Sequence, residues 1–215
     1  MKTPGRLFPA ALLLLGAAPA ATAAEWSDLL VGWRYFYPVN APTIAHDIIK
    51  NVAQFTVANR YSLGSNFLNV DVLMSNSYDP ASGATSSGAQ EIYVSYRHQL
   101  SLNKAFKAGI KGRVVRDVSV TVGADLNTNN TALAPGKRMI VAGPTVNLNP
   151  KKGFADLGVW LYKEWSHNSF APAGEKDVEY DATVMFNLTW GLPIAFSKEV
   201  SSTFKGFAYA TLPKG

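Results

Sequence analysis

The sequence predicts an all-β protein, an antiparallel transmembrane β-barrel of the outer-membrane type. Three observations predict this fold: an N-terminal export signal, a series of strand-length segments that are apolar at every second position, and connections that alternate between long and short. Strands of bacterial outer-membrane barrels have this two-residue period, and long extracellular loops and short periplasmic turns join them.

Residues 1–23 read as a secretory signal peptide. Lys2 and Arg6 give it a positive start, residues 7–16 form its apolar region, and Ala21-Thr22-Ala23 is a small-residue cleavage pattern. The apolar region is too short to cross a bilayer as a helix. We therefore expect a mature barrel domain over residues 24–215.

Composition excludes several classes of protein. There is no cysteine, so an exported domain must be held together by a large core or by a membrane instead of disulfides. Of the 20 basic residues, Lys2 and Arg6 leave with the signal peptide, and the remaining 18 exceed the 15 acidic residues by three. That surplus is too small to indicate nucleic acid as a partner, and no metal or cofactor motif occurs.

The first predicted strand, residues 29–37, places Leu29, Val31 and Trp33 on one face and Arg34 and Phe36 on the other. Six further segments show the same alternation and are predicted as strands. With the apolar residues of one face, they are residues 51–61 (Ala53, Phe55, Val57), 66–75 (Leu68, Val70, Val72), 90–100 (Ile92, Val94, Tyr96), 114–126 (Val118, Val120, Val122), 157–165 (Leu157, Val159, Leu161) and 180–190 (Val184, Phe186, Leu188). Residues 138–148 alternate less clearly, and Pro144 indicates a local distortion there. A ninth strand is predicted within residues 203–212.

The connections predict the orientation. Longer loops are expected at residues 38–50, 76–89, 127–137 and 166–177, and shorter turns at 62–64, 103–109, 149–153 and 191–193. Because long loops face outward in outer-membrane barrels, the first strand would run outward from the periplasm.

Two other all-β folds share the alternation. A soluble β-sandwich also alternates, and a lipocalin-like barrel would place the apolar residues inside. Aromatic residues near strand ends favour the membrane barrel, whose outward face contacts lipid and carries girdles at both interfaces. They are Trp33, Tyr35, Tyr37, Tyr61, Tyr96, Trp165, Tyr180 and Trp190.

Nine strands are an odd number, whereas bacterial single-chain barrels have even numbers. An odd count leaves unpaired edges in lipid, which is energetically prohibitive. We therefore expect the protein to continue beyond Gly215 with an odd number of further strands.

Several stretches resemble one known family. They are residues 66–71 with Asp79-Pro80, 91–93 with Tyr96-Arg97 and Leu100-Ser101, 116–118, 123–128, 161–165, and 204–207 with 213–215. In this order they are similar to the nucleoside-specific channel-forming Tsx-like outer-membrane proteins. The resemblance covers most of the mature chain and implies a twelve-stranded barrel with a narrow channel that conducts nucleosides and deoxynucleosides. Nine visible strands and three more would match that number.

A nucleoside channel needs aromatic faces for the base and fixed polar groups for the ribose and base edges. The presumed inward faces supply both kinds: Phe36, Tyr93, Trp160 and Tyr162 beside Arg34, Asn69, Asp71, Glu91, Arg97, Asp117 and Glu164. Inward polar residues are also the rule in barrels that do not conduct, where charges pair across a plugged interior. Arg116 shares the outward phase of Val118, so it either lies at the periplasmic rim, as the preceding Lys111 and Arg113 favour, or a bulge shifts its phase.

Two further functions stay open. An outer-membrane acyl hydrolase would need a Ser–His pair with an acidic residue. The candidates are Ser166, His167, Ser169 and Glu164. The three histidines are scattered along the sequence, however, which argues against a catalytic group and therefore against an enzyme. A structural or receptor barrel would use its loops, with 79–88 and 127–137 as surfaces for partners such as phage or toxins.

Overall fold

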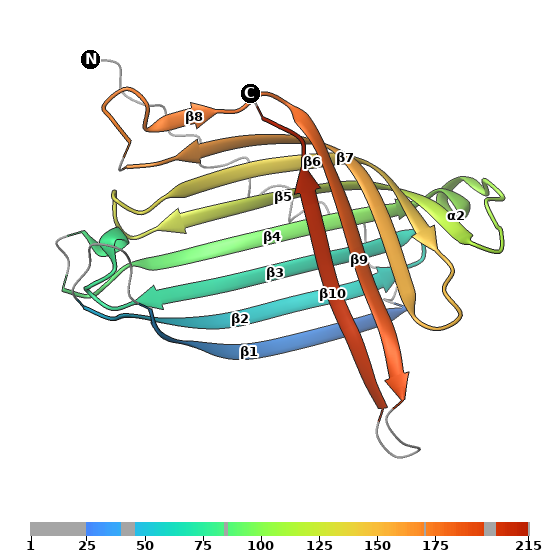
Figure 1. The fold of residues 1–215 in the computed structure, drawn as a ribbon. Coiled ribbons are helices and arrows are strands. Elements are labelled where there is room, and N and C mark those ends of the chain that lie inside the picture. Colours follow the sequence, from blue (N-terminus) through green and yellow to red (C-terminus); the bar gives the residue numbers. More distant parts are fainter. Residues whose placement is uncertain (1–24, 40–45, 84–85, 170, 196–200, 215) are drawn as a thin grey trace.

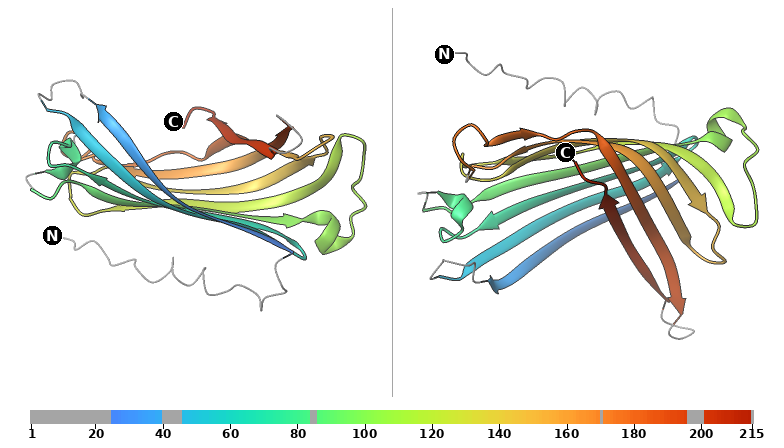
Figure 2. Two further views of the ribbon diagram at one scale, coloured as in Figure 1. Left: turned by 90° about the horizontal axis from the view of Figure 1, so that it is seen from below. Right: turned by 45° about the horizontal axis from the view of Figure 1, so that its top comes forward.

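The computed structural model describes residues 25–39, 46–83, 86–169, 171–195 and 201–214 (Figure 1). The predicted signal peptide lies outside these ranges. Within them the chain forms one ten-stranded antiparallel sheet with almost no helix, so the predicted all-β antiparallel class is confirmed. The sheet curls into a half-barrel, which Figure 2 shows from two sides.

The strands follow one another in the sheet in chain order, apart from one short strand, β8, that pairs with the end of β7. A short helix, α2 (Leu102–Phe106), follows β4, and a single 3₁₀ turn, η1 (Pro80–Ser82), lies between β3 and β4. The strands are β1 (Trp26–Val39), β2 (Ile48–Tyr61), β3 (Gly64–Ser75), β4 (Gln90–Ser101), β5 (Val115–Asn129), β6 (Gly136–Leu148), β7 (Phe154–His167), β8 (Asp177–Glu179), β9 (Thr183–Ala195) and β10 (Ser201–Thr211).

All nine predicted strands are present, but the predicted turn at residues 191–193 is wrong. There β9 continues to Ala195, and Pro193 pairs with Thr203 of β10. The pairing of β7 with β9 ends at Gly191, so Pro193 lies where β9 has a strand on one side only. A proline without a backbone N–H is tolerated at such a free edge.

Several connections differ in length from the prediction. The loop expected at 38–50 is shorter, because β1 extends to Val39 and β2 begins at Ile48. The turn expected at residues 103–109 is part of a longer connection, residues 102–114, that contains α2. The loop expected at 127–137 is reduced to residues 130–135, because the ladder with β4 continues through Asn127, Thr128 and Asn129. Polar side chains made this stretch resemble a loop, although its backbone still pairs.

The two faces of the curved sheet differ in which side chains they bury and which they expose. Directly paired residues of an antiparallel ladder point to the same side, so the registers place one set of side chains on the concave face and the other on the convex face. The concave face holds the buried cluster Met139, Val141, Trp160, Tyr162 and Met185. The convex face exposes apolar side chains along its strands, including Leu29, Val31, Phe55, Ile92, Val120, Val122, Ile140, Leu157, Val159, Leu161, Phe186 and Leu188.

Three of the predicted aromatic residues of the convex face lie toward strand ends: Tyr61 is the last residue of β2, at the end that carries α2, and Tyr35 of β1 and Trp165 of β7 lie toward the opposite end. Trp33, Tyr96 and Trp190 instead lie near the middle of β1, β4 and β9. Tyr61 and Tyr96 join a polar network in which His98 Nδ1 lies 2.8 Å from Asn66 Oδ1. Tyr180, predicted with this group, instead places its ring 4.9 Å from Lys214 Nζ. The Tyr37 side chain lies outside the described part.

Strands β1 and β10 occupy the two ends of the sheet order. In the described residues, no backbone ladder joins them. One ion pair links them, between Lys205 Nζ of β10 and Asp28 Oδ2 of β1 at 3.4 Å. Both side chains are exposed, and such pairs contribute about 0–1 kcal/mol.

Candidate lumen of the half-barrel

All eleven side chains that the sequence placed in a lumen belong to the concave face. Direct ladder partners show which residues share this face: Asp71 pairs with Tyr93 and Tyr93 with Asn127. On the next strands, Asp125 pairs with Met139 and Met139 with Glu164. The residues are Arg34, Phe36, Asn69, Asp71, Glu91, Tyr93, Arg97, Asp117, Trp160, Tyr162 and Glu164. The local alternation was sufficient to assign their side of the sheet, but not the neighbours they meet there.

Asp125 of β5 is the centre of a polar cluster on this face. It accepts hydrogen bonds from Tyr93 Oη at 2.9 Å and Ser95 Oγ at 2.7 Å, and Arg97 Nη1 lies 2.6 Å away. Asp125 is only 7% exposed. Three strong donors satisfy its charge, as a buried carboxylate requires. Sequence reasoning missed Asp125 as a site residue, although its inward phase was readable from the alternation.

Glycines let two large side chains lie flat along the wall. Arg97 passes over Gly123, where an added Cβ would come within 2.4 Å of Arg97 Cδ. Trp160 lies over Gly158, where a Cβ would come within 2.5 Å of its indole. The guanidinium of Arg97 is 5.9 Å from the Trp160 ring centroid, within cation–π range. Arginine, indole and carboxylate therefore form one continuous patch of β4, β5 and β7.

Trp160 and Tyr162 are covered, which changes their candidate role. They are 3% and 2% exposed, so their faces are not open to a solute. Trp160 Nε1 donates to Thr145 Oγ1 at 3.0 Å, and Thr145 is hydrogen-bonded to Thr121 at 2.6 Å. These contacts make Trp160 part of the packed wall.

Other aromatic rings do reach the open concave side. Phe36 is exposed, and β10 adds Phe207 and Tyr209, which are 69% and 62% exposed. Phe207 pairs with Thr189 and Tyr209 with Asn187, which lie on the concave face. The two rings are parallel within 4°, with centroids 6.5 Å apart. The sequence signal that could have found them is the alternation of Lys205, Phe207 and Tyr209.

Glu164 lies at the loop end of β7 among cations and hydroxyls. Lys214 Nζ donates to it at 2.7 Å, Ser166 Oγ donates at 2.7 Å, and Tyr162 donates to the same carboxylate. Lys137 completes the group at 4.0 Å. The carboxylate is thus fully engaged in the structure.

The remaining predicted polar residues also have partners. Arg34 pairs with Asp71 at 2.9 Å, Asn69 accepts from Gln54 at 2.9 Å, and Glu91 accepts from Asn127 at 2.8 Å. Most charges of the concave strands are therefore neutralised locally, as expected for side chains removed from bulk water.

Arg116 is the second residue of β5, at the end that carries α2, and of its two expectations the structure shows the bulge. The ladder between β5 and β6 shifts between Val115 and Asp117, a bulge that changes the phase of Arg116. Its Nη2 pairs with Asp156 Oδ1 at 3.2 Å. Asp117, predicted to line the lumen, accepts from Ser101 Oγ and from the backbone N–H of Asn103.

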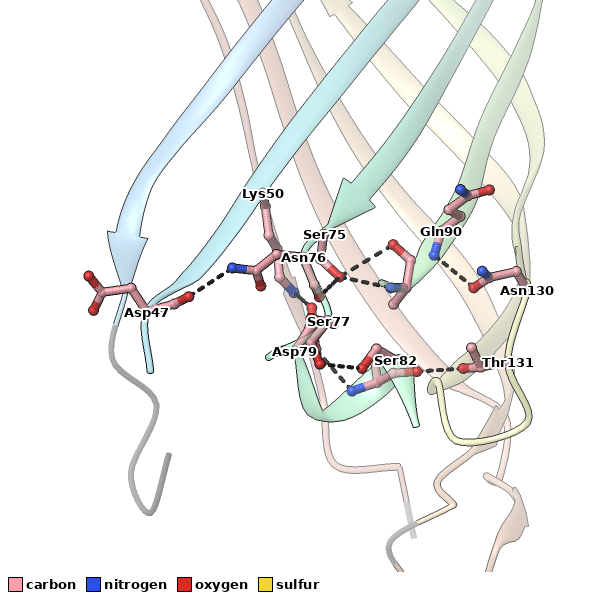
Figure 3. A network of polar contacts seen from close by, with 12 residues as sticks. Asp47, Lys50, Ser75, Asn76, Ser77, Asp79, Ser82, Gln90, Asn130 and Thr131 are labelled. Atoms are coloured by element: carbon pink, nitrogen blue, oxygen red, sulfur yellow. Dashed lines mark hydrogen bonds and ion pairs between the residues drawn. The ribbon is translucent and has the colours of Figure 1, made fainter. Parts of the chain in front are cut away.

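The loop between β3 and β4 is tied to the wall (Figure 3). Asp79 caps η1 by accepting from the Ala81 N–H at 2.9 Å and pairs with Lys50 Nζ of β2 at 2.8 Å. Thr131 Oγ1 donates to the Ala81 carbonyl oxygen at 2.5 Å. Burial alone would raise the pKa of Asp79, but the Lys50 ammonium and the Ala81 N–H outweigh it and hold that pKa below its ordinary value.

The histidines are distributed over three places. His46 stacks on Tyr78 with centroids 4.3 Å apart, and His98 lies on the convex face. His167 lies between Asp177, whose Oδ1 is 2.6 Å from Nδ1, and Ser169, whose Oγ is 2.8 Å from Nε2. Asp177, and not Glu164, is therefore the acidic partner of His167.

No family model, curated protein or solved structure matches the chain. In the described ranges, no group of three or more His, Asp or Glu side chains could hold a metal ion. No described helix is long and apolar enough to cross a membrane.

Proposed function

We propose that this protein is an outer-membrane channel for small, uncharged polar molecules, with nucleosides as the first candidates. The observation that carries the proposal is the inversion of polarity across the sheet. Exposed apolar side chains predominate on the convex face, whereas the concave face carries ion pairs, hydroxyls and amides beside its buried apolar cluster. A soluble protein rarely exposes so continuous an apolar surface, and a lipid-facing barrel requires it.

Strand length and aromatic position support a place in the outer membrane. A 14-residue strand such as β1 is about 46 Å long at about 3.3 Å per residue. At a tilt of about 40° it covers about 35 Å, which exceeds the apolar band of about 25 Å. Tyr61 at one end of the convex face and Tyr35 and Trp165 toward the other have the positions of interfacial aromatic residues.

Local neutralisation of the lumen charges favours uncharged permeants. Each cation of this surface lies beside an anion, so the surface has no excess of one charge. The ion pairs are Arg34–Asp71, Arg97–Asp125 and Lys214–Glu164. Such a surface offers donors and acceptors to ribose hydroxyls and base edges without attracting either class of ion strongly. Phe36, Phe207 and Tyr209 offer open rings for a base, and stacking tolerates different bases.

Planar-bilayer conductance of the protein purified from outer membranes tests the proposal. We expect open channels with weak ion selectivity, reversible block by added adenosine or thymidine, and much weaker block by the same concentration of a hexose. Membranes that stay silent after insertion, or channels that nucleosides do not block, contradict it. Insertion is checked separately by protease protection of the barrel in vesicles.

One observation favours a second candidate function, ester hydrolysis. Asp177, His167 and Ser169 form a hydrogen-bonded series with the order of an acid, a base and a nucleophile. Against it, Ser169 is 8% exposed and donates to the Ala132 carbonyl oxygen at 2.5 Å, so its hydroxyl is held within the loops. Labelling of Ser169 by a fluorophosphonate, abolished by His167→Ala, would support hydrolysis. Absence of both labelling and release of fatty acid from phospholipid vesicles rejects it.

A further inference from the structure

We propose that the concave face at the α2 end of the half-barrel binds the anionic group, a phosphate or a carboxylate, of a small organic molecule. The site is distinct from the aromatic and ion-paired patch around Asp125. Binding there does not require that the protein conducts, so the proposal goes beyond the channel function.

A cavity of about 250 Å³ lies at this place. Polar and charged side chains of the six strands from β2 to β7 and of α2 line it. The lining includes Arg60, Ser65, Gln99, Lys104, Arg116 and Asp156. Its volume suits a phosphate or carboxylate together with part of the molecule that carries it.

The donors of this cavity stand in one row across neighbouring strands. Arg60 of β2 is directly paired with Ser65 of β3, and Ser65 with Gln99 of β4. Directly paired side chains of an antiparallel ladder lie about 5 Å apart on one face. Trp26 of β1 pairs with Arg60 on the other side and is half exposed, so an indole ring extends the row.

Arg60 differs from the other cations of the concave strands. Within the described residues, its guanidinium forms no hydrogen bond and no ion pair. It is close enough to Asp156 for the two charges to attract each other through space. By contrast, Arg34, Arg97 and Arg116 each pair with a carboxylate of the wall. An exposed guanidinium that faces a cavity presents a planar fork of donors, which matches the oxygens of phosphate and carboxylate.

The two carboxylates of the cavity are already occupied by the wall. Asp156 Oδ1 accepts from Arg116 and, at 2.9 Å, from Asn147 Nδ2. Asp117 accepts from Ser101 at one oxygen and from backbone N–H groups at the other. Lys104 of α2 pairs with Glu25 at 3.0 Å. Arg60 is therefore the cation of the cavity that is left for a ligand, and its guanidinium favours a negatively charged acceptor group.

Binding of adenosine 5′-monophosphate, adenosine and inorganic phosphate to the detergent-solubilised protein tests this proposal by isothermal titration. We expect the monophosphate to bind, Arg60→Gln to weaken it at least about tenfold, and Arg60→Lys to weaken it less, because a lysine keeps the charge without the fork. Lys152→Gln, which removes one exposed charge from the turn at the same end, is the matched control and should leave binding unchanged.

The probes separate the anionic group from the rest of the ligand. Competition of inorganic phosphate with the monophosphate, together with adenosine binding that Arg60→Gln leaves unchanged, supports an oxyanion site. Equal binding of the monophosphate to the wild type and to a folded Arg60→Gln variant, or no binding to the wild type, overturns the proposal. If Arg60→Gln does not keep the circular dichroism of the wild type, Gln99→Leu replaces it, with a smaller expected loss because Gln99 supplies a neutral donor, and unchanged binding then overturns the proposal.

Discussion

Arg97 of β4 lies across Gly123 of β5, so closely that a Cβ at residue 123 would stand 2.4 Å from Arg97 Cδ and 2.6 Å from the Tyr96 carbonyl oxygen. The two residues are direct ladder partners. The absent side chain allows the guanidinium to reach Asp125 on the strand of Gly123 and to approach the Trp160 ring on β7. A glycine thus determines where a charge of the lumen wall is placed.

Replacing Gly123 by valine should therefore displace Arg97 from the wall. Overpacking of this kind lowers the free energy of unfolding by about 1–3 kcal/mol, and the displaced guanidinium would extend into the lumen. Urea unfolding and single-channel conductance measure the two effects, and we expect both to fall. Gly112→Ala is the control, because the nearest atom to a Cβ at Gly112 is the Val115 carbonyl oxygen at 3.7 Å, an ordinary van der Waals contact. If the Gly123→Val variant keeps the stability and the conductance of the wild type, the Arg97 side chain does not lie across residue 123 as described.

Replacing Asp125 by alanine should be more damaging than replacing any single one of its donors. The change leaves the Arg97 charge without its partner and deprives Tyr93 and Ser95 of their acceptor. Removing one member of a buried pair lowers stability by about 3–5 kcal/mol. The double variant Asp125→Asn with Arg97→Gln should lose less than the sum of the two single changes, because contacting residues are coupled. Additive losses in urea unfolding would mean that the pair is not coupled.

Variants of the exposed aromatic residues should affect nucleoside binding, whereas a variant of the buried Trp160 should affect stability. Phe207→Ala and Tyr209→Ala should weaken nucleoside block by about 1–3 kcal/mol, the range of base–aromatic stacking, while stability changes little. Trp160→Ala should instead lower the free energy of unfolding by about 3–5 kcal/mol, because its indole is packed in the wall. Phe204→Ala, which removes an exposed ring on the opposite face of β10, is the control. Unchanged block in both lumen variants would remove these rings from the binding surface.

The sequence predicted the side of each lumen residue because the two-residue period of a strand is a local property. It could not predict that Gly143 and Gly158 let Trp160 sink into the wall, because that depends on strands paired across the sheet. It also could not distinguish the rim from the bulge at Arg116, which is decided by the register with β6. The partners of Glu164 illustrate the same limit, since Lys214 is 50 residues away along the chain.

The ends of the connections were predicted least well. Asn127 and Asn129 have loop-like side chains, yet their backbone continues the ladder while their amides donate to the Pro135 carbonyl oxygen. Gly191 and Pro193 have turn-like chemistry, yet β9 passes through both. In each case pairing with a neighbouring strand outweighs the local preference, because each paired residue gains ladder hydrogen bonds that a loop would leave to water.

The ion pair between Asp79 and Lys50 should make the β3–β4 loop sensitive to acid. The folded pKa of Asp79 lies below its ordinary value, so the pair contributes its full stability above the unfolded pKa of 3.8. That contribution is lost as pH falls through the lower folded pKa. Hydrogen exchange of residues 76–89, followed by mass spectrometry, should therefore accelerate only below about pH 4.

Asp79→Asn should reproduce that acceleration at neutral pH, because the amide keeps much of the cap but removes the charge that attracts Lys50. Asp47→Asn is the matched control, since the contact of Asp47 with Asn76 is made by its backbone carbonyl oxygen, at 2.8 Å from Asn76 Nδ2 (Figure 3). Slow exchange in Asp79→Asn at pH 7, equal to that of the wild type and of Asp47→Asn, would show that the 3₁₀ turn and the Thr131 contact hold the loop without the ion pair. Fast exchange confined to the Asp79 variant assigns the anchoring of this loop to one carboxylate and one ammonium.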